Sequence, residues 1–232
     1  MVLDRAGWYQ FLVKLPLTGV GGAAVCLAGS LWLATTPPAI ASEATKPAES
    51  APPAGLVRVD RAAPRVLLDL RYASERNVLG RAVYGPGHRA WLRPEVARQL
   101  GRADASLREF GYRLVLLDAW RPLRVQRALL EAPGARGFVE SDPGRALHAI
   151  GVAVDVTLAD ARGRELPMPT AWDHFGPEAA LPYHGGDPVV RHNLGVLQKG
   201  MGGAGFVGCP TEWWHFVYQP QFGARTFPER RR

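Results

Sequence analysis

The stretch from Gly144 to Leu158, GRALHAIGVAVDVTL, constrains the fold more than any other part of the chain. Within it, Gly151–Val156 alternates with the two-residue period of a strand, and small residues share one face with Asp155. A carboxylate on such a face is costly to bury without a cation or hydrogen-bond donors. His148 precedes Asp155 by seven residues. We therefore expect a positive charge beside Asp155, and a zinc ion is the economical choice.

A second motif near the C-terminus, Thr211–Phe216 (TEWWHF), carries Glu212 and His215. Two imidazoles and one carboxylate form a zinc ligand set that leaves a coordination position open for water. A glutamate three residues before the last histidine is well placed to accept a proton from that water. Strand alternation places Glu212 and His215 on opposite faces, so this function requires a bend near Pro210. Taken singly, either motif also fits ordinary core or surface residues.

Composition sets the broad class of the protein. The chain has 232 residues, 47% of them hydrophobic and 21% charged, which is enough for an ordinary globular core. Its net charge of +7 is spread along the chain without a basic block interleaved with aromatics, so we expect no nucleic-acid partner. The two cysteines, Cys26 and Cys209, exclude a disulfide framework, and Cys209 is predicted to be a free buried thiol.

The pattern of the first 41 residues predicts that the protein is exported. Residues 1–41 read as a signal peptide or membrane anchor, because Arg5 and Lys14 precede an apolar stretch and Ala39-Ile40-Ala41 fits a cleavage site. Residues 42–56 form an Ala/Pro-rich linker, and residues 57–232 form one catalytic domain. We expect a periplasmic or extracellular protein that contacts the membrane only through the N-terminal segment, if that segment is uncleaved.

Periodicity within the domain predicts a mixture of helices and strands. An apolar stripe at helical spacing, with Pro94 in the first turn, predicts a helix over residues 93–110. The apolar run Tyr112–Asp118 predicts a buried strand that ends just before Arg121. Further elements are expected as helices over residues 123–130 and 189–201 and as a strand over residues 212–218.

Together, the pattern His-x2-Gly-x-Ala-x-Asp at 148–155 and Glu-x-x-His at 212–215 resembles the zinc D-alanyl-D-alanine dipeptidases. Asp69–Ser74, followed by Asn77, Gly80 and Tyr84, resembles the N-terminal signature of this family, and Leu166–Asp173 resembles a later segment. The resemblance spans roughly residues 65 to 218 in the family's order.

The resemblance implies an α+β fold, in which a small antiparallel sheet is flanked by helices in a single catalytic domain. It also implies one Zn2+ per chain and hydrolysis of a small peptide substrate, D-Ala-D-Ala. The residue roles that it implies are His148, Asp155 and His215 as metal ligands, Glu212 as the base, Arg121 as the group that stabilises the transition state, Asp173 as the partner of the substrate ammonium, and Tyr72 as part of the substrate site.

Several alternatives stay open at this stage. Ala146 stands where the family has a serine, and Pro169 and Trp172 also depart from its pattern, so substrate preference is in question. A D,D-carboxypeptidase or murein endopeptidase of the same group, or a non-catalytic zinc module that binds wall peptides, would share most of the motifs. Arg121 could simply pair with Asp118, Tyr72 could be a core-edge aromatic, and Asp173 could cap the turn before Phe175. The spare histidines, His174, His184 and His192, are expected to be solvated.

Overall fold

The computed structural model describes residues 51–142 and 145–219. The predicted signal or anchor over residues 1–41, most of the predicted linker and the basic tail lie outside these residues. The predicted domain boundaries therefore stay predictions. Within the described ranges, no helix combines the length and apolar character needed to cross a bilayer.

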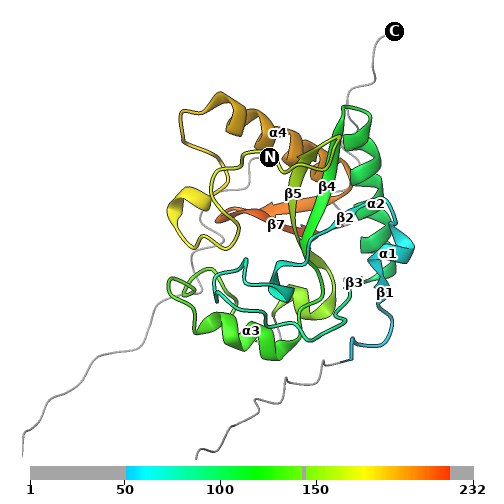
Figure 1. Cartoon of the computed structure of the whole chain (residues 1–232), viewed down its shortest axis with the longest axis vertical. Helices are drawn as coiled ribbons and strands as arrows, with labels where there is room; N and C mark the ends of the chain where they lie inside the picture. The colour runs from blue at the N-terminus through cyan, green and yellow to red at the C-terminus, as the bar shows by residue number, and fades with distance from the viewer. Residues whose placement is uncertain (1–50, 143–144, 220–232) are drawn as a thin grey trace, which may run out of the picture. The chain divides into compact units, whose positions relative to one another are not determined.

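A five-stranded sheet forms the centre of the domain, in the order β2-β4-β5-β7-β6 (Figure 1). Three of its four strand pairings are antiparallel, whereas the edge strand β2 pairs with β4 in parallel. The expected α+β class is thus confirmed, with one parallel edge added to the antiparallel sheet. The strands are β2 (Leu67–Leu68), β4 (Tyr112–Asp118), β5 (Ala153–Asp160), β6 (Phe206–Cys209) and β7 (Glu212–Tyr218).

The two central strands are buried on both faces. In β5, the side chains on the face of Val154 and those on the face of Asp155 are both buried, except at Asp160, the last residue of the strand. In β4, Leu114–Asp118 are all buried. Continuous burial requires cover on each side of a sheet, and it explains why these segments read as apolar runs in the sequence. Asp155 and Asp118 are therefore carboxylates placed inside the core.

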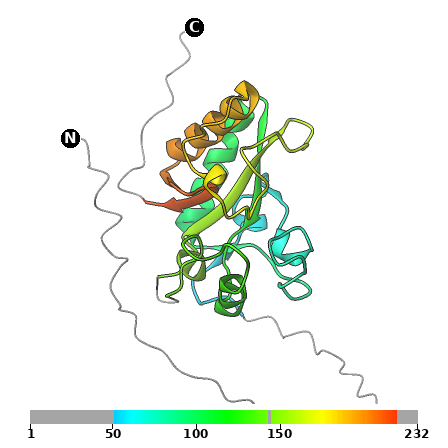
Figure 2. The same ribbon diagram turned by 90° about the vertical axis from the view of Figure 1, so that its left-hand side faces the viewer.

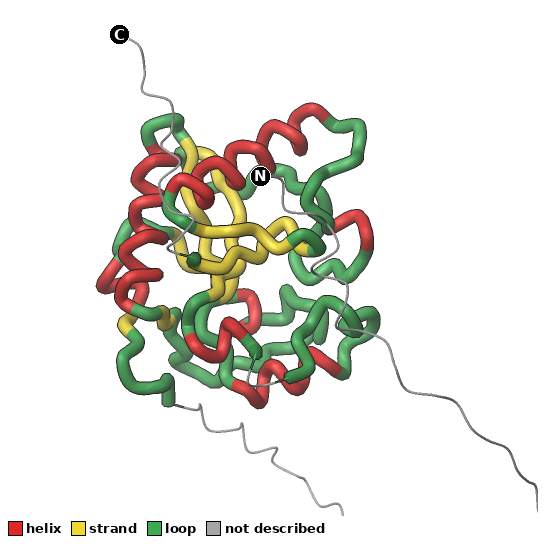
Figure 3. Tube along the Cα trace, turned by 180° about the vertical axis from the view of Figure 1, so that it is seen from behind, coloured by secondary structure: helices red, strands yellow, loops and turns green. Residues whose placement is uncertain are grey.

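Two helices, α2 (Pro94–Arg108) and α4 (Pro188–Gly203), pack side by side against the sheet (Figures 1 to 3). The apolar stripe predicted for α2 is buried: Val96, Leu100, Ala103 and Leu107. Asp187 caps α4, because its carboxylate accepts hydrogen bonds from the backbone N–H of Val189 at 2.8 Å and of Val190 at 3.4 Å. Both predicted helices are confirmed, with ends shifted by one or two residues.

The remaining elements are short. Helix α3 (Leu123–Leu130) follows β4 after a four-residue connection that contains Arg121, and it lies below the sheet in Figure 1. Within residues 65–84, only Leu67–Leu68 pair with the sheet, and a 3-10 turn follows. The others are β1 (Val57–Arg58), α1 (Val59–Ala62), η2 (Arg71–Ala73), β3 (Trp91–Leu92), η3 (Leu147–Ile150) and η4 (Pro177–Ala179).

The contact between α2 and α4 depends on a glycine. A Cβ atom at Gly200 would lie 2.7 Å from Leu107 Cδ2 and 2.8 Å from its Cγ, whereas a Cβ at Gly195 would meet nothing within 4 Å. We predict that Gly200→Ala lowers the free energy of unfolding by about 1–3 kcal/mol through overpacking. The control, Gly195→Ala in the same helix, should raise it by about 0.5–1 kcal/mol. Urea denaturation of both variants tests this, and equal effects of the two would contradict it.

Candidate active site

Strand register brings the central residues of the site together. Asp155 on β5 lies opposite Asp118 on β4 and opposite His215 on β7. The side chain of Asp155 is almost fully buried, and its Oδ1 lies 2.9 Å from His215 Nδ1. Cross-strand neighbours of this kind have Cβ atoms only about 5 Å apart, so backbone pairing alone places the carboxylate against the imidazole.

His148 reaches the same point from η3, the turn before β5. The turn closes through Gly151 at φ +70°, where a Cβ would lie 2.8 Å from Leu56 Cδ2, so glycine suits both the backbone and the space. His148 Nδ1 lies 2.6 Å from the carbonyl oxygen of Ala119. A carbonyl can only accept, so Nδ1 carries the proton, and a neutral ring presents the Nε2 lone pair to Asp155.

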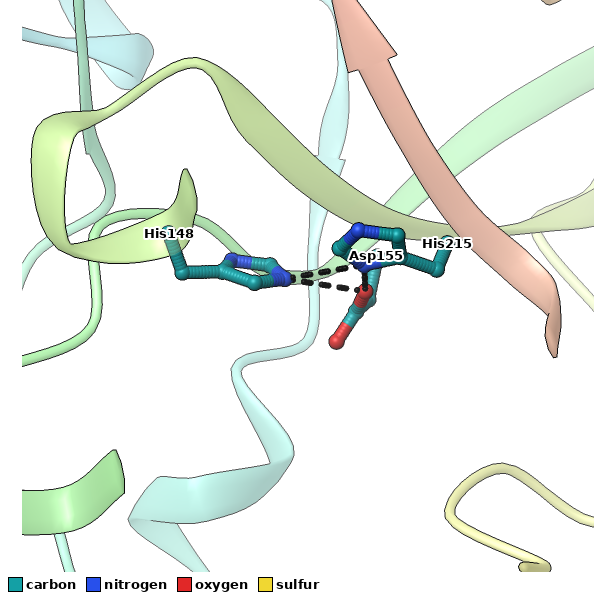
Figure 4. A group of neighbouring side chains, drawn as sticks. All are labelled: His148, Asp155 and His215. Carbon is teal, nitrogen blue, oxygen red and sulfur yellow. Dashed lines mark hydrogen bonds and ion pairs between the residues drawn. The ribbon is translucent and has the colours of Figure 1, made fainter. Parts of the chain in front are cut away.

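Three ligand atoms therefore converge (Figure 4). His148 Nε2 lies 3.2 Å from Asp155 Oδ1 and 3.1 Å from His215 Nδ1. Burial raises the pKa of the Asp155 carboxyl, but the charges and hydrogen bonds of the two histidines, when these are protonated, outweigh that effect and hold this pKa well below its usual range. When the histidines are neutral, their lone pairs and the carboxylate oxygen repel one another at such distances unless a cation lies among them. Among the described residues, the three side chains form a candidate metal-binding group, hereafter the metal-binding group, and their donor set fits a divalent transition metal.

Arg121 is held rigidly at the edge of this group. Its Nε donates to Asp118 Oδ2 at 2.8 Å, one Nη to Gln126 Oε1 at 3.0 Å, and the other Nη to Asp155 Oδ2 at 3.2 Å. The guanidinium is buried and lies over the ring of Tyr72, 5.0 Å from its centroid. The ion pair with Asp118, considered above as an alternative to catalysis, is thus present, and it fixes Arg121 next to the metal-binding group.

Glu212 enters the cavity from the first position of β7. The sequence required a bend for this, and the structure contains a register shift between Gly208 and Cys209, where Cys209 pairs with Glu212. The Glu212 carboxylate has no hydrogen bond or ion pair with any described residue. Burial raises its pKa to about 7, although His215 opposes the shift. A carboxylate with this pKa, open to a cavity, is suited to accept and return a proton near neutral pH.

Asp173 is a second buried carboxylate with an unusual environment. Tyr72 Oη donates to its Oδ1 at 3.0 Å and the Val78 N–H to its Oδ2 at 3.3 Å, but no described cation pairs with it. Burial raises its pKa to about 7 despite the field of Arg121. Its φ of +62° lies in the left-handed region, which costs energy for a side chain other than glycine. The expected alternative role as a cap is wrong, because Gly176 occupies the N-cap of η4.

One cavity of about 160 Å³ joins these groups. Its lining includes all seven residues proposed from the sequence: Tyr72, Arg121, His148, Asp155, Asp173, Glu212 and His215. Clefts that bind drug-sized ligands usually measure about 300–1,000 Å³, so this cavity suits a smaller molecule.

Several contributors were not identified from the sequence. Gln126 and Tyr84 support Arg121, the first directly and the second through a hydrogen bond to Asp118. The bond between Tyr84 and Asp118 joins segments that are 34 residues apart and that only the fold brings together. Gln126 follows Arg121 by five residues, so its only signal in the sequence was its place in the adjoining helix. Cys209 lines the cavity but stands outside the metal-binding group. His174, His184 and His192 are exposed, as expected.

Comparison with known proteins places this site in context. A family model described as D-ala-D-ala dipeptidase matches residues 53–231. D-alanyl-D-alanine dipeptidase of Escherichia coli is 34% identical over 155 residues, which cover 66% of this chain and 79% of the relative. The Enterococcus faecium enzyme of that name is 25% identical over 190 residues, 72% and 93% of the two chains. The solved LdcB LD-carboxypeptidase shares 19% identity at a TM-score of 0.42, covering 72% and 69%.

The buried Asp173 carboxyl should make stability depend on pH. Its folded pKa of about 7 exceeds the usual value near 3.9, so the folded state binds the proton more tightly, and stability is lost as pH rises from about 4 to 7. We predict that Asp173→Asn stabilises the metal-free protein at pH 8 by up to about 4 kcal/mol and has little effect at pH 4.5. Urea denaturation after chelation measures both values. A gain of equal size at the two pH values would show that the carboxyl does not titrate in this way.

Proposed function

Because this chain belongs to the D-alanyl-D-alanine dipeptidase family of peptidases, we propose that it hydrolyses free D-Ala-D-Ala with one zinc ion per chain. The observation that carries the proposal is the environment of Asp173. A buried carboxylate with a raised pKa and no cationic partner is a site prepared for a cation. The ammonium of an unblocked dipeptide is such a cation, and a cavity of about 160 Å³ suits a ligand of that size.

In this proposal, His148, Asp155 and His215 hold the metal, and zinc, when bound, supplies a Lewis acid that activates water and polarises the scissile carbonyl. The donor set supports zinc, since two imidazoles and a carboxylate leave a position open for catalysis. Ala119 fixes the tautomer of His148 through its carbonyl, which keeps Nε2 free to act as a ligand.

Glu212 acts as the proton carrier. It accepts a proton from the attacking water and returns it to the departing amine, and burial favours acceptance of that proton because it raises the pKa of the Glu212 carboxyl, to about 7 in the metal-free protein. No described residue engages its carboxylate, so it is available for this exchange. Its position at a bulge fixes where the carboxylate enters the cavity.

Arg121 stabilises the developing oxyanion. A guanidinium has five N–H donors, and the hydrogen bonds to Asp118, Gln126 and Asp155 use three of them. The two that remain are on a group that cannot rotate away from these partners. Donors that are fixed before the reaction need no reorganisation as charge develops, which is the physical basis of transition-state stabilisation.

The metal assignment predicts the zinc content of variants. The purified protein should hold about one zinc per chain, and His148→Ala or His215→Ala should remove it, because two remaining ligands bind the ion poorly. As controls, His184→Ala and His192→Ala should keep full zinc, since both histidines are exposed and lie outside the group. Glu212→Ala should also keep zinc but lose hydrolysis by several orders of magnitude. Elemental analysis after dialysis measures these contents; full zinc in His215→Ala would refute the ligand set.

The substrate assignment is tested with a blocked dipeptide. If Asp173 binds the substrate ammonium, free D-Ala-D-Ala should be cleaved tens to thousands of times more efficiently than its N-acetylated form. The reason is that loss of a charge-assisted hydrogen bond in a desolvated site costs on the order of 2–5 kcal/mol of binding free energy. Asp173→Ala should narrow the difference mainly by weakening activity on the free dipeptide. The measurement is amine release, reported as kcat/KM for each substrate.

The converse result would favour a different activity. If the acetylated dipeptide or a wall pentapeptide is the better substrate of the unmodified protein, the chain is a carboxypeptidase or endopeptidase. Stoichiometric zinc without hydrolysis of any of these peptides would instead favour a non-catalytic module that binds them.

A further inference from the structure

The lining of the cavity contains a cation that the proposed chemistry does not use. A free dipeptide carries an ammonium and a terminal carboxylate, and Asp173 complements only the first. Apart from the two histidines of the metal-binding group, the cationic side chains that line the cavity are Arg121 and Arg145. Arg121 is already bonded to Asp118, Gln126 and Asp155, so Arg145 is the free candidate for the second charge.

Among the described residues, the only partner of the Arg145 side chain is Glu140, in a weak ion pair. Its side chain is 65% exposed, and its Nε lies 3.8 Å from Glu140 Oε2, which is too long for a hydrogen bond. An exposed ion pair at this distance contributes little free energy, so a carboxylate ligand can displace Glu140 from Arg145 at low cost. The guanidinium can meet such a carboxylate with two parallel hydrogen bonds.

Several residues of the cavity lining have apolar side chains: Phe138, Val139, Ala146 and Leu147. Gln126 ties the wall to the catalytic group, because its Nε2 donates to the Glu140 carbonyl at 2.9 Å while its Oε1 accepts from Arg121. The backbone that carries Glu140 is thereby fixed relative to Arg121, and Arg145 is five positions further along the chain.

We propose that Arg145 forms a carboxylate-binding subsite that selects dipeptides with a free C-terminus. This inference rests on the proposed dipeptidase function and deepens it, since Asp173 and Arg145 together would recognise both charged ends of the substrate. It predicts that the enzyme discriminates against a substrate whose terminal carboxylate has been converted to an amide.

The experiment compares D-Ala-D-Ala with D-alanyl-D-alaninamide on the full chain loaded with zinc. The unmodified protein should favour the free acid by about tenfold or more in kcat/KM. Arg145→Ala should raise KM for the acid about tenfold and leave kcat within about threefold. It should have little effect on either constant for the amide. Arg145→Lys should recover part of the preference, because a point charge replaces a bidentate partner. The matched control is Arg136→Ala, which removes the charge of an exposed arginine outside the cavity lining.

A binding measurement separates recognition from chemistry. In a Glu212→Gln background, calorimetry should show that Arg145→Ala weakens binding of the free acid about tenfold and leaves binding of the amide unchanged. Equal losses for acid and amide would show that Arg145 only supports the loop, and no loss would show that it does not contact the substrate; either result overturns the inference. Failure of the unmodified protein to cleave either dipeptide would contradict the dipeptidase function, and the binding comparison alone would then decide the subsite.

Discussion

The pairing of β5 with β7 is the constraint on which the site depends. It places Asp155 directly opposite His215, and the pairing of β5 with β4 places the same residue opposite Asp118. A slip of one residue in either register would turn every side chain of a strand to the other face, and in β5 this would exchange the apolar face of Val154 and Leu158 with the face of Asp155. The hydrophobic core therefore fixes the position of a carboxylate that the core itself would otherwise disfavour.

Much of this arrangement was accessible from the sequence, for identifiable reasons. Tyr112–Asp118, Leu123–Leu130 and Glu212–Tyr218 have the predicted bounds, because long apolar periodicity in each is decided locally. The two-residue β2 and its parallel pairing were not predictable, since they depend on a partner strand more than forty residues away. The bend that brings Glu212 into the cavity was required by the chemistry, but no local pattern specified the bulge at Cys209.

For the individual site residues, the sequence suggested alternatives that the fold shows to be compatible. Arg121 was weighed as either a partner of Asp118 or a catalytic group, yet the bond to Asp118 is what immobilises it beside Asp155. Tyr72 was weighed as either a core aromatic or a substrate-site residue. It is fully buried, and its hydroxyl nevertheless reaches Asp173 on the cavity wall. Such dual roles arise where a polar site is enclosed within the core, because the same contacts both pack the residue and orient it.

The charges around the cavity explain why so costly an arrangement persists. Asp118, Asp155, Asp173 and Glu212 are buried together with the guanidinium of Arg121, an excess of negative charge that a dry interior cannot support alone. A divalent ion and the ammonium of a dipeptide would bring the sum of these formal charges to zero. Until the ammonium arrives, Asp173 and Glu212 hold their charge weakly, as their pKa values near 7 indicate. Binding of the ammonium at Asp173 would then offset the cost of burying that carboxylate while leaving Glu212 free to accept a proton. Under the proposed function, the free protein is thus destabilised at the groups that a charged substrate satisfies, and an N-acetylated peptide brings no positive charge to offset that cost.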